Sequence, residues 1–177
     1  MEEFRVLPGL PATGPWPEQF SASGHGTHRE GIVAQFFPEG KPSWIGNFQP
    51  GWTEYSAVLP HANGRSVIVI AGGQGYVIAP GERRLVAVFG GTLEVALAIP
   101  SLGVMVVGDG VRLEAVDASG LRWRSRRISW DGMRAVRVEG DEIKGEAWSV
   151  LDDCYYPFAV DVTTGTVDGG SYTGPPE

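Results

Sequence analysis

The sequence predicts an all-β protein, an antiparallel meander of about twelve strands in an incomplete propeller-like or sandwich arrangement. From residue 31 onward, short runs rich in Val, Ile, Tyr, Phe and Trp alternate with Gly, Pro and Asp-Gly breaks, which is the pattern of strands joined by tight turns. Gly and Pro supply 26 and 13 of the 177 residues, so breaks are too frequent for long helices. No apolar run reaches the roughly 18 residues of a membrane helix, so we expect no membrane partner.

Residues 1–30 are expected to form a Pro/Gly-rich N-terminal arm. Within them, residues 7–28 carry four Pro and four Gly and show neither helical nor strand periodicity, which favours a loop. The remaining residues, 31–177, are predicted to be a single all-β domain with about three weak repeats.

The predicted strands each combine β-branched or aromatic residues with a Gly, Pro or Asp break at their ends. Residues 66–71 and 103–107 are continuously apolar, so both faces of these strands are expected to be covered. Gly72-Gly73 should form a tight hairpin turn, because both glycines tolerate a positive φ. In order, the predicted strands are 32–37, 53–59, 65–71, 75–79, 84–89, 93–99, 104–108, 111–117, 121–128, 133–139, 142–150 and 156–162.

Two tryptophans are predicted to face inward. Trp123 alternates with arginines and should point to the opposite side of its strand. Trp148 lies in an alternating run between Ala147 and Ser149, and we expect it to be buried as well.

A weak internal repeat relates residues 66–81, 103–121 and 141–166. The phrases Ala115-Val116-Asp117-Ala118-Ser119-Gly120 and Ala159-Val160-Asp161-Val162-Thr163-Thr164-Gly165 are the most alike. In each, the Asp side chain can accept hydrogen bonds from backbone N–H groups of the turn, and Gly supplies a left-handed residue.

This succession of strand, turn, strand and Asp/Gly turn, followed by a Trp-bearing strand, resembles a blade of a quinoprotein-type or WD-like β-propeller. The resemblance covers about residues 65–170. It implies that Asp and Gly close a turn between strands and that an aromatic side chain packs between blades. Asp117, Gly120 and Trp123 match this pattern. Asp161 and Gly165 match its turn, and Val167 stands near the position where the pattern has Trp. Propellers close with four to eight blades and three units are visible, so the quinone cofactor does not carry over, and we expect no cofactor.

The net charge indicates which classes of partner are expected, and the cysteine content indicates the cellular compartment. The formal net charge is −7, and nucleic-acid affinity depends on cationic contacts to phosphate, so no nucleic-acid partner is expected. A basic protein is a better electrostatic match, although the charge can also serve solubility alone. Cys154 is the single cysteine, which fits a cytoplasmic location.

Residues 44–52 form the first candidate binding site. They combine two indole rings, Trp44 and Trp52, with the side-chain amides of Asn47 and Gln49. Flat apolar faces beside hydrogen-bonding amides suit a sugar ring or a protein hot spot. The alternative is that both tryptophans plug the end of the β core.

A stripe of arginines forms the second candidate binding site. Arg122, Arg124 and Arg126 alternate onto one strand face, and guanidinium groups bind carboxylates in a bidentate way. The stripe can dock an acidic partner, protect an exposed strand from aggregation, or form ion pairs within the chain.

The sequence gives little indication of a catalytic or metal site. His25, His28 and Glu30 have ligand-like spacing, but a zinc site needs three or four ligands at tetrahedral geometry, so no metal is expected. The neighbouring pairs Asp152/Asp153 and Asp141/Glu142 face opposite sides of a regular strand. No catalytic residue is assigned, and enzymatic activity is left open with a non-enzyme favoured.

The expected function is that of a non-catalytic protein-interaction module, by analogy of class with soluble bacterial accessory or immunity-like proteins. Its expected partner is another protein, and both a monomer and a homodimer stay open. One alternative is a β domain that binds a carbohydrate or small ligand through the loop from Trp44 to Trp52. The other is a hydrolase with converging carboxylates.

Overall fold

The computed structural model describes residues 3–24, 26, 28–61, 63–117 and 120–175. Within these residues the chain forms sixteen strands in four open four-stranded sheets, and the two helices are 3-10 turns of three residues each. The all-β prediction is confirmed. None of the four sheets closes into a barrel, and no closed propeller is present among the described strands. Neither 3-10 turn has the length to span a bilayer.

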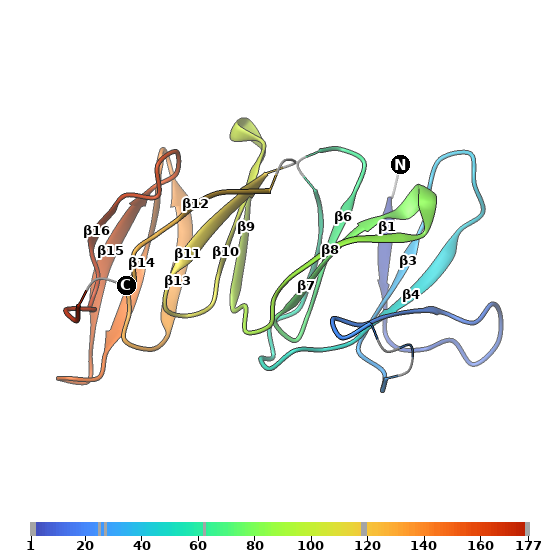
Figure 1. The fold of residues 1–177 in the computed structure, drawn as a ribbon, viewed down its shortest axis with the longest axis horizontal. Coiled ribbons are helices and arrows are strands. Elements are labelled where there is room, and N and C mark those ends of the chain that lie inside the picture. Colours follow the sequence, from blue (N-terminus) through green and yellow to red (C-terminus); the bar gives the residue numbers. More distant parts are fainter. Residues whose placement is uncertain (1–2, 25, 27, 62, 118–119, 176–177) are drawn as a thin grey trace. The chain divides into compact units, whose positions relative to one another are not determined.

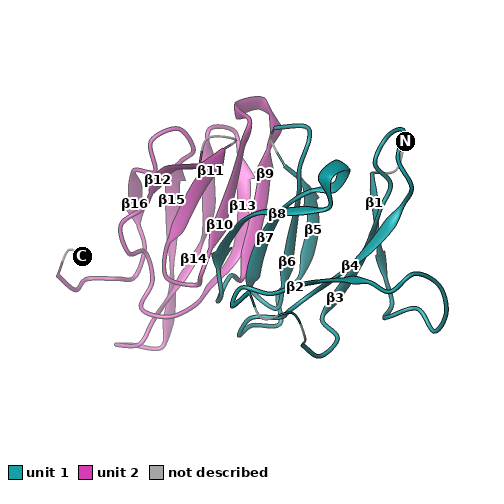
Figure 2. Cartoon of the chain, turned by 45° about the vertical axis from the view of Figure 1, so that its right-hand side comes forward, with its two compact units in different colours: residues 1–93 teal, residues 94–177 magenta. Residues whose placement is uncertain are grey.

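The first of two compact units spans residues 1–93 and contains two sheets (Figure 2). In the first sheet, ordered β1-β3-β4-β2, β2 runs parallel to β4 and the other pairs are antiparallel. The second sheet is an antiparallel meander in chain order, with the 3-10 turn η1 (Pro80–Glu82) between its last two strands. The strands of the first sheet are β1 (Phe4–Leu7), β2 (Glu18–Phe20), β3 (Ile32–Phe36) and β4 (Trp44–Phe48), and those of the second are β5 (Ala57–Pro60), β6 (Val67–Ala71), β7 (Gln74–Ala79) and β8 (Arg84–Gly90).

The second unit spans residues 94–177 and consists of two further antiparallel meanders (Figure 1). The 3-10 turn η2 (Pro100–Leu102) joins the first two strands of one of them. One meander comprises β9 (Val95–Ile99), β10 (Val104–Gly108), β11 (Leu113–Asp117) and β12 (Gly120–Arg124), and the other comprises β13 (Met133–Glu139), β14 (Glu142–Ser149), β15 (Cys154–Asp161) and β16 (Val167–Gly169).

Each unit has its own apolar core, to which both of its sheets contribute. In the first unit the core is aromatic: the ring of Phe48 lies 5.5 Å from that of Tyr76 across the two sheets, and Phe36 stacks on Trp44 at 4.5 Å. A side chain at position 46 would meet the Phe48 ring at 2.8 Å, so Gly46 makes room for it. In the second unit the core is mainly aliphatic, with Trp123 and Phe158 among its members.

All twelve predicted strands overlap strands of the structure, and four further strands were not predicted. β1, β2 and β16 are edge strands of three or four residues, too short to show alternation. β4 contains Gly46 and Asn47, residues that are poor strand formers. The predicted burial of β6 and β10 on both faces is confirmed, since all five residues of each are buried.

The organisation of the chain also differs from the prediction. In the segment expected to be an arm, residues 4–7 and 18–20 are strands of the first sheet. The boundary between the two compact units falls between residues 93 and 94, whereas residues 31–177 were expected to form one domain. Residues 1–30 supply both outer strands of the sheet around β3 and β4, and the two units have separate apolar cores.

The three repeat units fall on equivalent positions of three sheets. Residues 66–81 cover β6 and β7, residues 103–121 cover β10 and β11, and residues 141–166 cover β14 and β15. Each pair is the middle hairpin of a four-stranded meander. The repeat in the sequence therefore coincides with a recurring hairpin.

The turn after β15 has the predicted chemistry. The Asp161 Oδ1 atom accepts hydrogen bonds from the backbone N–H groups of Thr163 and Thr164, at 2.9 and 2.7 Å, and Gly165 has a φ of +74°. Trp123 of β12 packs on this turn: its indole Nε1 donates to the Val162 carbonyl at 2.8 Å, and a Cβ on Gly165 would lie 2.7 Å from the indole ring. This contact joins the two sheets of the second unit.

Of the two tryptophans predicted to face inward, Trp123 is buried and Trp148 is not. Trp148 is half-buried, and its indole nitrogen donates to Asp153 at 3.0 Å. Ala147 and Ser149 take the core side of β14, so alternation places Trp148 on the opposite face. The prediction for Trp148 was wrong because small residues occupy the inner face of this strand.

Replacing Trp123 by Ala is expected to lower the free energy of unfolding by about 3–5 kcal/mol, since it removes a buried aromatic ring from the core. Trp123→Phe should lose less, because it keeps the ring and gives up the hydrogen bond to Val162. Urea denaturation of both variants measures these changes. A Trp123→Ala protein with wild-type stability would contradict the inward packing.

The Asp161 turn should make stability depend on acid pH. Its hydrogen bonds, led by that from the Thr164 backbone, lower the pKa of Asp161 below the ordinary 3.8. The folded state therefore binds this proton less readily than the unfolded state. The stabilisation is full above pH 3.8 and is lost as the pH falls through the lowered pKa.

Asp161→Asn removes this titration, so the stability difference between wild type and the variant should shrink as the pH falls below 3.8. Denaturation at several pH values from neutrality downward measures it. A difference that stays constant throughout would show that the carboxylate charge is irrelevant to the turn.

Candidate functional site

Two of the four predicted binding residues in the segment 44–52 are part of the core. Trp44 is 3% exposed, and its indole nitrogen donates to the Pro80 carbonyl at 2.9 Å. Asn47 is 1% exposed; its Oδ1 atom accepts from the Gly31 amide at 3.0 Å, and its Nδ2 atom donates to Gln19 at 2.9 Å. The expected aromatic loop is in fact the interior strand β4, so Trp44 and Asn47 are removed from the candidate binding residues.

The other two residues of the set lie beyond the end of β4. Gln49 is half-buried, and its backbone joins it to the core: its N–H donates to Phe20 at 2.9 Å, and its carbonyl accepts the Tyr76 hydroxyl at 2.7 Å. Trp52 is the opposite case, because its side chain is 89% exposed. Of the two tryptophans in this segment, one stabilises the core and the other is presented to solvent.

The backbone on both sides of Trp52 is held by a set of hydrogen bonds that we call the Trp52 bracket. The amide of Gly51 donates to Ala71, that of Trp52 to Gly91, and that of Thr53 to Gly72, at 2.9, 3.0 and 3.0 Å. The Thr53 hydroxyl adds a bond to the Leu93 carbonyl at 2.7 Å. The exposed indole therefore stands on a fixed segment of backbone.

Close packing explains why glycines surround the bracket. A Cβ at Gly51 would lie 2.5 Å from the Gly91 carbonyl oxygen, and one at Gly73 would lie 2.5 Å from the Thr53 hydroxyl. Gly72 and Gly73 have φ values of +51° and +83°, as the predicted hairpin turn requires. The Gly-Gly pair thus turns the chain and lets three segments approach closely.

A shallow hollow of about 400 Å³ adjoins the bracket residues. Pro50, Thr53 and Gly72 from the bracket region form part of its lining. Arg29, Glu30 and Glu54 are exposed and bring both signs of charge to it. The exposed indole and this hollow make the end of β4 the candidate binding site.

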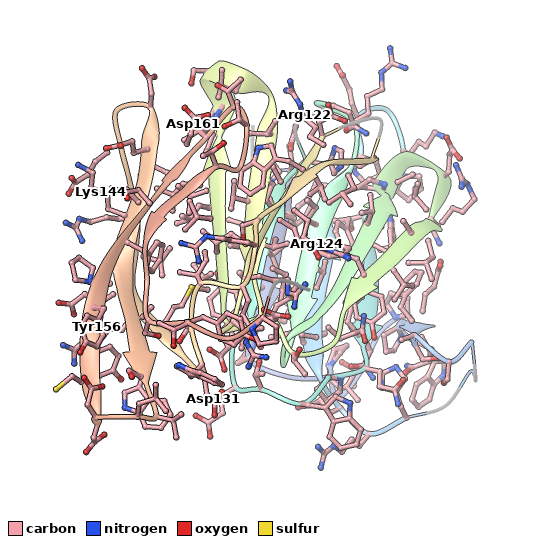
Figure 3. The ribbon with its side chains drawn as sticks, turned by 60° about the vertical axis from the view of Figure 1, so that its left-hand side comes forward. Arg122, Arg124, Asp131, Lys144, Tyr156 and Asp161 are labelled. Atoms are coloured by element: carbon pink, nitrogen blue, oxygen red, sulfur yellow. The ribbon has the colours of Figure 1, made fainter. Side chains whose placement is uncertain are left out.

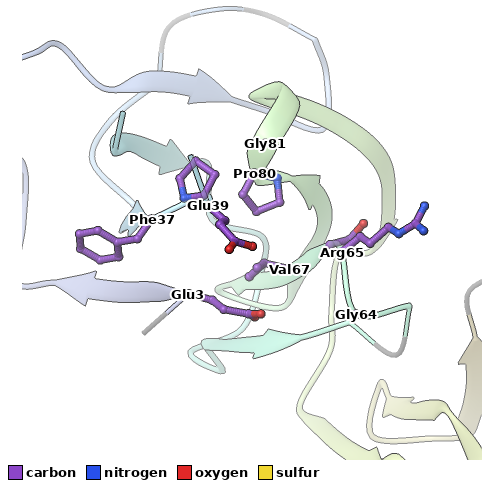
Figure 4. Close-up of a pocket in the computed structure, with 10 residues that line it drawn as sticks. Glu3, Phe37, Glu39, Gly64, Arg65, Val67, Pro80 and Gly81 are labelled. Carbon is purple, nitrogen blue, oxygen red and sulfur yellow. The ribbon is translucent and has the colours of Figure 1, made fainter. Parts of the chain in front are cut away.

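A second hollow, of about 560 Å³, lies elsewhere in the first unit (Figure 4). Phe37, Val67 and Pro80 give it apolar surface, and Glu3 and Glu39 give it carboxylates. Its lining comes from four separate segments, around residues 3, 37–39, 64–67 and 80–81. No local motif links these segments, which is why the sequence did not point to this hollow.

The arginine stripe is occupied by contacts within the chain. Arg122 and Arg124 lie on β12 (Figure 3). Arg124 pairs with Glu114 at 2.5 Å and Arg122 with Asp117 at 3.7 Å. Arg126 donates to the Gly169 carbonyl at 2.7 Å. Arg122 and Arg124 therefore form the ion pairs within the chain that were one of the alternatives, and Arg126 is bonded to a backbone carbonyl. An acidic ligand would have to compete with these contacts.

The carboxylates that bear on the hydrolase alternative lie away from the two hollows described above. Asp152 accepts a hydrogen bond from the Tyr156 hydroxyl, which lowers the pKa of Asp152. At Glu94, burial raises the carboxyl pKa, and the charges of Asp131 and Asp109 add to the rise. None of these groups lines either hollow described above.

The histidines show no ligand arrangement in the part of the chain that the structure describes. His61 is buried and accepts the Asn63 amide at its Nδ1 atom at 3.1 Å, which supports a turn. His25 lies outside the described residues. Among the described residues, no group of three or more His, Cys, Asp and Glu side chains is placed to hold a metal ion.

Comparison with known proteins gives no family to draw on, because no protein-family model matches the sequence and no curated protein matches it at a significant level. The function therefore rests on the chemistry of the surface.

Trp44 and Trp52 should respond very differently to truncation. Trp44→Ala removes a buried ring and is expected to cost about 3–5 kcal/mol of unfolding free energy, whereas Trp52→Ala should stay within about 0.5 kcal/mol of wild type. Urea denaturation of the two variants compares them directly. Equal losses of stability would mean that Trp52 is also a core residue.

Proposed function

We propose that the chain is a non-catalytic protein-interaction module that binds its partner through Trp52. The observation that carries this proposal is a tryptophan side chain 89% exposed on a backbone fixed by four hydrogen bonds. Tryptophan is among the residues most enriched at binding hot spots. Because the bracket orders the backbone before binding, little further backbone entropy is lost on association.

The proposed partner is a basic protein. The net charge of −7 favours encounter with a positively charged surface and speeds association at low salt. We further propose that the protein works in the cytoplasm, because its single cysteine, Cys154, is free and exposed, which fits a reducing compartment.

A carbohydrate ligand is the second candidate, and Trp52 is also the residue that favours it. An exposed indole face can stack on the apolar side of a sugar ring. The amide of Asn47, however, is engaged inside the sheet, so one of the two amides predicted to accompany the indole is not available to a sugar. The protein partner is therefore preferred.

The test compares two exposed tryptophans. A partner captured by the tagged wild-type chain is purified and titrated against wild type, Trp52→Ala and Trp16→Ala. Trp16 is a matched control because it is 93% exposed and lies outside the Trp52 bracket. Trp52→Ala should weaken binding by roughly thirtyfold or more, the loss typical of a hot spot, and Trp16→Ala should bind like wild type.

Equal affinity of all three proteins would refute the role of Trp52. Binding to a glycan array that is lost in Trp52→Ala, without a captured protein, would instead support the carbohydrate alternative.

A further inference from the structure

Strand β8 is the most exposed strand at an edge of the second sheet. It spans seven residues, lies at the end of the order β5-β6-β7-β8, and is paired with β7. Five of its seven residues are exposed, including Val86 at 47%. An edge strand of this kind directs unpaired N–H and C=O groups outward, and these can pair with another strand.

The turn that precedes β7 determines which residues of β8 direct their backbone N–H and C=O groups away from the sheet. The two-residue turn Gly72-Gly73 makes Ala71 and Gln74 a directly opposed pair, and in such hairpins the closing pair is hydrogen-bonded. The backbone groups of successive residues along β7 then point alternately to β6 and to β8. Those of Tyr76 therefore bond to β6. Val88 lies opposite Tyr76, and its N–H and C=O groups therefore point away from β7.

β8 is less protected than the other edges along most of its length, because its one charged residue, Arg84, stands at its first position. After Arg84, residues 85–93 contain no charged side chain and no proline. β9 is also uncharged, but it lies against β13. The remaining edge strands carry charged residues or a proline: Arg5 in β1, Glu18 in β2, Pro60 in β5, Arg122 and Arg124 in β12, Arg134, Arg137 and Glu139 in β13, and Asp168 in β16.

The register of β8 on β7 leaves a regular stretch for pairing. A bulge at Val86 interrupts the ladder, and a bulge is one way of protecting an edge. From Ala87 to Gly90, however, each residue has a partner on β7 in unbroken register. The unprotected part of the edge is thus centred on Val88 and Phe89.

We propose that two copies of this chain form a homodimer by antiparallel pairing of β8 with β8, with the two-fold axis at Val88. This register opposes Val88 to Val88 and Ala87 to Phe89, apolar pairs that stabilise a sheet. Arg84 lies beyond the bulge at Val86, so no like charges meet within the regular stretch from Ala87 to Gly90. The same pairing at β12 would bring arginines together, which is unfavourable.

Sedimentation velocity of the full chain, from about 1 to 200 µM, tests this dimer. Wild type should be dimeric at the upper concentrations. Val88→Lys should raise the dimer dissociation constant by at least about tenfold, because like charges directly opposite each other repel. Leu121→Lys on β12, at a position 56% exposed, introduces the same charge at another edge and should leave the dimer unchanged.

Ala87→Lys serves as a second variant in case Val88→Lys does not fold, because Ala87 is exposed and belongs to the same regular stretch. Circular dichroism confirms folding of each variant. A monomeric wild type at 200 µM, or a folded lysine variant of β8 that dimerises as tightly as Leu121→Lys, would overturn the proposal. Trp52→Ala should dimerise normally, so this test is independent of the proposed partner site.

Discussion

The structure of each unit depends on the burial of apolar side chains between two four-stranded sheets. A single sheet of short strands has two faces to cover, and pairing sheets removes one face of each from water. In the first unit this burial is carried by the aromatic rings of β3 and β4 against β6 and β7. In the second unit Trp123 adds a directional contact, because its indole both packs on the Gly165 turn and hydrogen-bonds to Val162.

Once the cores are set, the remaining exposed apolar groups become informative. Trp52 is held outward by backbone hydrogen bonds, although burying an aromatic ring of its size is ordinarily favourable. The β8 edge exposes valines where most other edges carry charge or proline. A protein stable through its two cores can keep such groups at the surface, and we attribute them to association with a partner and with a second copy.

The fold class was predictable because short β-branched and aromatic runs between glycine-rich turns have few other solutions. The turn at Asp161 and Gly165 was also predictable, because its hydrogen bonds and its left-handed glycine depend only on neighbouring residues. Strand β4 was missed because Gly46 and Asn47 suggest a loop, while their roles depend on distant neighbours, Phe48 packing over Gly46 and Gln19 bonding to Asn47. Exposure likewise separates Trp44 from Trp52, and only the tertiary structure decides which of two tryptophans eight residues apart is buried.

Hydrogen exchange of the full chain tests the central claim most directly, because it reports on β4 without altering a residue. If residues 44–48 form the interior strand of a packed sheet, their amides should be among the slowest to exchange, close to the limit set by global unfolding. The amides of the exposed loop at residues 12–16 should exchange rapidly by comparison. Exchange at residues 44–48 as fast as in that loop would show that the aromatic segment is not a core strand, and the packing described for the first unit would be incorrect.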